Sequence, residues 1–163
     1  MQVETVDYKA ADASTTLARS LRDTGFAVLA NHPITPDRIT EIYDGWGDFF
    51  AGEDKFDYAV QPPAHDGYFA FRSENAKDSP VKDLKEFFHV YPGCGLPAAL
   101  TEMTRQISAD LNALRCALLA WIQAEAPARV TESLSMPPVP MMGDSEQILL
   151  RLLHYPLVID PEP

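Results

Sequence analysis

A nearly continuous apolar run close to the C-terminal end, residues 147–155, constrains the fold most strongly. Its length is typical of a β-strand, and Pro156 ends it because proline cannot donate a ladder hydrogen bond. An apolar strand needs neighbours to cover it, and the short sequence after Pro156 offers no further strand. We therefore expect an edge strand whose partners come from earlier in the chain or from another chain.

The composition predicts one folded domain, residues 1–163. Hydrophobic residues make up 46% and charged residues 23%, as in average globular proteins. With 13 basic and 24 acidic residues the net charge is −11, which disfavours nucleic acid and anionic membrane surfaces as partners. No segment is typical of a signal peptide or a membrane span, and Cys94 and Cys116 form no CxxC motif. We expect a reduced, cytoplasmic protein.

Apolar periodicity predicts an α+β protein that is rich in helices. Asp12 is expected to cap the first helix, which Gly25 ends, and Thr35 is expected to cap the second, with Pro36 at its first position. The second helix carries an aromatic stripe that indicates packing against a broad surface. Helices are predicted at residues 13–24, 36–51 and 97–125, and short strands at residues 2–7, 26–30 (buried) and 86–91.

Two segments lack a regular pattern. Residues 60–83 combine prolines, Gly67 and clustered polar residues, and they predict a long loop around an aromatic patch. Residues 136–142 are proline-rich and predict an extended connector. The connector divides the expected domain into residues 1–135 and residues 136–163.

Four stretches, in order, resemble the isopenicillin N synthase-like family of iron(II)- and 2-oxoglutarate-dependent dioxygenases in its bacterial form. Pro33 replaces the glycine that commonly follows the first of them. The four stretches are GFAVLANH after the opening strand (25–32), the aromatic helix end FF with DK (49–55), GYF with ENAK and DLKEFFHV (67–90), and LRLLHYP (150–156). The resemblance implies a helical N-terminal region packed on a jelly-roll (double-stranded β-helix) core, here incomplete, with iron(II) and 2-oxoglutarate bound inside the roll.

The family's metal ligands are missing from this sequence. The oxygenase chemistry needs two histidines and one carboxylate on one face of the iron. None of the histidines at positions 32, 65, 89 and 154 begins a His-x-Asp or His-x-Glu motif, so no metal ligand and no catalytic residue is predicted in this chain. We expect the ligands to lie after Pro163, and we expect this chain alone to bind neither iron(II) nor 2-oxoglutarate productively.

The remaining histidines have simpler interpretations. His65 and Asp66 are neighbours on an extended segment and would point to opposite sides, which disfavours chelation. His89 is expected to be a hydrogen-bonded strand residue, and His32 to cap a turn.

A few residues take roles from the resemblance. Tyr155 precedes the strand-ending proline and is expected to hydrogen-bond 2-oxoglutarate, although a core position is an equal alternative. Leu153 stands where family members often have asparagine. Arg151 is a candidate for binding a carboxylate, or is exposed to solvent. The loop residues that could border a substrate pocket are Tyr68, Phe69, Phe71 and Arg72.

Two functions follow as hypotheses. The first is an N-terminal fragment of an oxidoreductase that hydroxylates or desaturates a small molecule, inactive as this chain alone. The second is a noncatalytic interaction module, or a homo-oligomer, that pairs through the edge strand at residues 147–155. Substitution of Leu150 or Leu152 by lysine should then abolish dimerisation.

Overall fold

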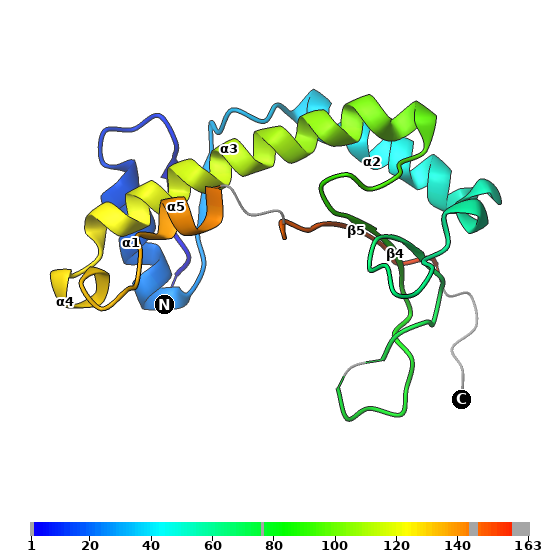
Figure 1. Ribbon diagram of the computed structural model, residues 1–163. Coiled ribbons are helices and arrows are strands. Elements are labelled where there is room, and N and C mark those ends of the chain that lie inside the picture. Colours follow the sequence, from blue (N-terminus) through cyan, green and yellow to red (C-terminus); the bar gives the residue numbers. More distant parts are fainter. Residues whose placement is uncertain (1, 76, 144–146, 158–163) are drawn as a thin grey trace. The chain divides into compact units, whose positions relative to one another are not determined.

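A computed structural model describes residues 2–75, 77–143 and 147–157 (Figure 1). The chain forms two compact units, Met1–Ile39 with Gln106–Ser145 (unit 1) and Thr40–Arg105 with Glu146–Pro163 (unit 2). The boundaries fall inside helix α2, Pro36–Ala51, and helix α3, Thr101–Glu125. The mixed helix-and-sheet class predicted from the sequence is confirmed, whereas the described residues do not show a jelly roll.

Unit 1 packs helices on a small parallel sheet. Strand β1, Thr5–Asp7, pairs with β2, Val28–Ala30, and Val6 lies opposite Leu29. Helix α1, Ala13–Thr24, runs beside the C-terminal half of α3, and α4, Ala128–Thr131, and α5, Pro138–Gly143, follow (Figure 1). The core consists of Val6, Ala13 and Leu17, with Leu21, Ala27, Leu29, Leu118, Trp121 and Ile122 packed against them.

Local signals set the ends of α1 and α2 as predicted. Gly25 has a φ of 79° and its backbone N–H bonds the carbonyl of Leu21, which is the left-handed helix stop that glycine tolerates. The Thr35 hydroxyl accepts the N–H of Arg38 at 3.3 Å, so Thr35 caps α2. Asp12 occupies the predicted cap position of α1, but its side chain makes no capping hydrogen bond.

Strand β2 is not the buried strand that its apolar sequence predicted. The side chain of Val28 is 54% exposed, and that of Phe26, just before the strand, is 70% exposed. Only β1 pairs with β2 among the described strands, so apolar side chains on its outer side remain uncovered. The sequence marks these residues as apolar but cannot say which element covers them.

Unit 2 contains an antiparallel sheet of three strands in the order β3–β4–β5. These are Gly67–Phe69, Glu86–Val90 and Leu150–His154, and Figure 1 shows β4 and β5 side by side. A short 3-10 helix, Asp54–Tyr58 (η1), follows α2, and a second one, Ala98–Leu100 (η2), precedes α3. The C-terminal apolar run thus finds its neighbour in β4, and β5 is an edge of this sheet, as predicted.

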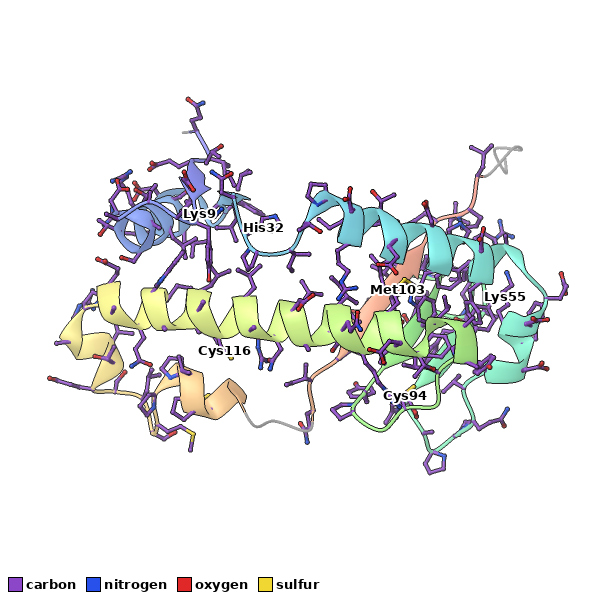
Figure 2. The ribbon with its side chains drawn as sticks, turned by 90° about the horizontal axis from the view of Figure 1, so that it is seen from above. Lys9, His32, Lys55, Cys94, Met103 and Cys116 are labelled. Atoms are coloured by element: carbon purple, nitrogen blue, oxygen red, sulfur yellow. The ribbon has the colours of Figure 1, made fainter. Side chains whose placement is uncertain are left out.

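The aromatic stripe of α2 covers one face of this sheet. The ring of Trp46 lies 5.0 Å from that of Phe88 in β4, and its indole N–H donates to the Thr104 hydroxyl at 3.0 Å. Met103 of α3 also faces α2 (Figure 2). Ile42, Trp46 and Phe50 are buried, but Tyr43 is 75% exposed, so the stripe is narrower than its sequence spacing suggested.

Two segments predicted to be irregular contain regular structure. Residues 67–69, inside the predicted loop, form β3 because they pair with residues 87–89 of β4. Helix α5, Pro138–Gly143, occupies most of the predicted connector at residues 136–142, and it begins at a proline, as helices commonly do. No helix of the described residues is long and apolar enough to cross a membrane.

Leu17 tests the packing of unit 1. It is 3% exposed, so Leu17→Ala should lower the free energy of unfolding by about 2–5 kcal/mol. Leu111→Ala, at a position 40% exposed in the same unit, is the control and should cost less than about 1 kcal/mol. Urea titration followed through Trp121, with Trp46 changed to Phe, reports unit 1 separately. Equal losses in the two variants would contradict the described core.

Candidate functional site

Alternation along the strands gives the sheet of unit 2 two chemically different faces. The pairing of Tyr68 with Phe88, and of Glu86 with His154, places these side chains on the face toward α2. We call this the inner face: Tyr68, Glu86, Phe88, Leu152 and His154. The opposite side, the outer face, carries Phe69, Phe87, His89, Arg151 and Leu153.

Aromatic rings form the base of the outer face. Phe69 and Phe87 are stacked, with ring centroids 4.5 Å apart and planes 13° from parallel. The Arg151 guanidinium lies 4.3 Å from the Phe87 ring centroid, within cation–π range. Phe87 is fully buried as a result, whereas the Arg151 side chain is 36% exposed above it.

Two hydrogen bonds fix the orientation of Arg151. Its Nε donates to Nε2 of His89 at 2.8 Å, and its Nη2 donates to Glu74 at 3.2 Å. A guanidinium is always a donor, so Nε2 of His89 must carry a lone pair. His89 is therefore neutral, and its Nδ1–H donates to the carbonyl of His65 at 3.1 Å. The prediction of a hydrogen-bonded strand histidine is confirmed.

Burial supports the neutral state of His89. Desolvation is the largest influence and lowers the pKa of His89, the bond to the His65 carbonyl opposes it, and the charge of Arg151 lowers the pKa further. Lys85 lies nearby, 2.7 Å from Asp83 and 3.6 Å from Glu74, and the hydrogen bond to Asp83 raises the pKa of Lys85. Beside the outer face, the cations Lys85 and Arg151 thus lie next to the carboxylates of Glu74 and Asp83.

The inner face contains an almost completely buried carboxylate. Glu86 is 3% exposed and accepts hydrogen bonds from Lys55 at 3.0 Å, from the Tyr68 hydroxyl at 2.5 Å and from Nδ1 of His154 at 2.8 Å. Lys55, just beyond the end of α2 in Figure 2, also donates to the carbonyl of Phe50 at 2.5 Å. Every donor of this cluster belongs to unit 2.

The cluster keeps Glu86 ionised. Burial alone would raise the pKa of Glu86, but the hydrogen bonds from Tyr68, His154 and Lys55 outweigh it, so that the pKa lies below its ordinary value. Burial, followed by the hydrogen bond to Glu86, raises the pKa of Tyr68. The Tyr68 phenol therefore stays protonated and remains a donor.

The structure separates the residues that the sequence grouped as a pocket border. Tyr68 is in the core with its hydroxyl bonded to Glu86, whereas Phe69 is on the outer face. Phe71 and Arg72 follow β3, with the Arg72 guanidinium 5.4 Å from the Phe71 ring and a φ of 60° at Arg72. Tyr155 directly follows β5, and its side chain is 66% exposed.

The sequence interpretation missed three residues that organise the sheet: Lys55, Glu86 and His154. A signal was present, because Glu86 opens the strand Glu86–Val90, where an unpaired charge would be costly. Its partners are 31, 18 and 68 positions away in sequence, so no local pattern could identify them.

The described residues contain no group of three His, Cys, Asp or Glu side chains that could hold a metal ion. His65 interacts with His89 through its backbone carbonyl. Nδ1 of His32 is buried without a hydrogen-bond partner, so the predicted capping role of His32 is not supported. The residues described here do not fit the family's iron site by themselves.

Comparison with known proteins identifies relatives of known class. A family model described as "non-haem dioxygenase in morphine synthesis N-terminal" matches residues 3–106. A structure from Shewanella oneidensis, described as a candidate oxygenase, is 37% identical, with a TM-score of 0.88 over 100% of this chain and 57% of its own. No curated protein sequence matches the chain.

Two further structures have the same fold. A candidate 2OG-Fe(II) oxygenase family protein from Caulobacter crescentus is 26% identical, with a TM-score of 0.68 over 98% of this chain and 58% of its own. A full-length protein from Neurospora crassa, solved in complex with alpha-KG, is 20% identical, with a TM-score of 0.69 over 93% and 54% of the two chains. The chain thus spans little more than half the length of the structures it matches.

Lys55 tests the buried carboxylate. Lys55→Met would leave Glu86 without its nearest full positive charge, and breaking a buried pair from one side costs about 3–5 kcal/mol. Lys82→Met, in the same unit, removes exposed hydrogen bonds and should cost less than about 1 kcal/mol. Urea unfolding of unit 2 is followed through Trp46, with Trp121 changed to Phe. A cost below about 1 kcal/mol for Lys55→Met would contradict the described role.

His89 predicts a pH dependence of stability. Its pKa is lowered in the folded chain, so the unfolded chain takes up the proton first as the pH falls. Its contribution should be complete above the ordinary histidine pKa of about 6.5 and be lost as the pH falls through the lowered folded value. NMR titration of the His89 ring measures this pKa directly. A folded pKa of His89 above the ordinary histidine value would contradict the assignment.

Proposed function

This chain belongs to the non-haem dioxygenase N-terminal family, and from that premise we propose that it forms the N-terminal part of an iron(II)- and 2-oxoglutarate-dependent oxidoreductase. We infer that the intact protein hydroxylates or desaturates a small molecule. The proposed architecture adds a jelly-roll core to the elements described above. When bound there, iron(II) and 2-oxoglutarate supply the oxidising chemistry.

The observation that carries the proposal is the organised outer face of the sheet. Stacked phenylalanines support a guanidinium whose orientation is fixed by a neutral histidine and a carboxylate. Ordered polar groups above an apolar base are typical of small-molecule sites. We infer that this face borders the ligand cavity of the intact protein.

The chain contributes binding groups to that cavity. The exposed Tyr155 phenol is available to donate a hydrogen bond to a carboxylate of 2-oxoglutarate. Arg151, held on Phe87, would orient an acceptor group of the co-substrate or substrate. Phe69, Phe71 and Arg72 would border the substrate. Metal ligands are proposed to come from outside the described residues.

Edge pairing of β5 with a second copy is the weaker alternative, because the relatives support an oxygenase. A lysine substitution that tests this pairing has to be placed at a residue other than Leu150 or Leu152. Leu150 and Leu152 are partly buried on the side toward α2, so lysine at either would disturb packing within the chain. Leu153, 46% exposed, is the suitable position for a lysine that disrupts edge pairing.

The proposed function is tested by 2-oxoglutarate turnover. The 163-residue chain with added iron(II) is expected to form no succinate catalytically, because its described residues supply no metal-binding group. The intact gene product that contains this chain is expected to form succinate, and to stop when iron is chelated. Catalytic succinate from the chain alone, or none from the intact product with iron and varied small-molecule substrates, would overturn the proposal.

A further inference from the structure

We propose that Glu86 is a positioning residue that sets the register of β5, and through it the side on which Arg151 and Tyr155 stand. The proposal deepens the proposed function and rests on it for its meaning in catalysis. Its physical basis is the bond between the Glu86 carboxylate and Nδ1 of His154, which joins the central strand to the edge strand at 2.8 Å.

The apolar pattern of β5 does not specify its register. Leucines occupy positions 149 and 153 on one side of the strand and positions 150 and 152 on the other. A slip by one residue would place Leu149 and Leu153 toward α2 in place of Leu150 and Leu152, so the leucine positions alone do not distinguish the two registers. The same slip would turn Arg151 inward and His154 outward. The polar residues of the strand must therefore select the observed register.

Polar pairs across β4 and β5 provide that selection. In the observed register Glu86 lies opposite His154, and His89 lies opposite Arg151. Slipping by one residue would place Leu153 or Tyr155 opposite Glu86 and leave a buried carboxylate short of a donor. It would also separate Arg151 from His89. Pairs on both faces thus oppose the slip. The buried pair of Glu86 and His154 opposes it most, because water cannot reach Glu86 to replace the donor that is lost.

The geometry also fixes His154. Glu86 is ionised and only accepts, so Nδ1 of His154 must carry hydrogen. The imidazole is stacked on Phe50, with centroids 5.2 Å apart and planes 15° from parallel. His154 is therefore held from two sides, and the next residue in the chain is Tyr155.

A matched pair of variants tests the proposal. His154→Gln keeps an N–H donor that can reach Glu86, whereas His154→Leu keeps apolar volume and removes the donor. Cross-strand NMR contacts between residues 87 and 153 and between residues 89 and 151 report the register. Amide exchange at residues 150–154 reports how firmly β5 is held.

His154→Gln is expected to retain the cross-strand contacts. His154→Leu is expected to lose them, or to show a second set of contacts from a second register, with amide exchange at residues 150–154 faster by about tenfold or more. The Arg151 Nε–H signal, on the opposite face from position 154, should shift only in His154→Leu. Unchanged contacts and exchange in His154→Leu would overturn the proposal. Leu17→Ala, which destabilises unit 1, serves as the control for general destabilisation.

A measurement on the unsubstituted chain keeps the proposal testable if His154→Leu does not fold. The ¹⁵N shifts of the His154 ring at neutral pH should show hydrogen on Nδ1, and a neutral ring with hydrogen only on Nε2 would overturn the proposal. These readouts need no turnover. A failed register test would leave the oxygenase proposal standing, and an inactive intact protein would leave the register result standing.

Discussion

A carboxylate that is almost completely removed from water has to be matched by donors, and in unit 2 the donors of Glu86 come from three different segments. Lys55 reaches it from η1, Tyr68 from β3 and His154 from β5. An unmatched charge here would cost more free energy than most single contacts contribute. The Glu86 carboxylate therefore favours the one arrangement of these segments that brings all three donors to it, over arrangements that bury similar apolar area without them.

This constraint explains why the two faces of the sheet differ. The ionic cluster and the aromatic stripe of α2 occupy the inner face, with Phe88 and Trp46 in contact. The outer face is left with Arg151 oriented above Phe87, and with Tyr155 exposed just after the strand. Structural charge lies on one side of the sheet and the groups proposed to bind ligand lie on the other.

Sequence predicted the features that local chemistry decides. Gly25 and Thr35 mark helix ends because a left-handed φ and a hydroxyl cap act within a few residues. The burial of β2 and the existence of β3 were mispredicted because both depend on which element lies alongside. The family motifs identified the class of protein, but the Glu86 cluster joins distant residues, and only the fold brings them together.

The most direct test of the account is a crystal structure of the intact gene product with 2-oxoglutarate bound. The ligand cavity is expected to be bordered by the outer face, with the Tyr155 hydroxyl within hydrogen-bond distance of the oxo-acid and with Glu86 and His154 paired on the inner face. A ligand bound against the inner face, or remote from the strand Leu150–His154, would contradict it.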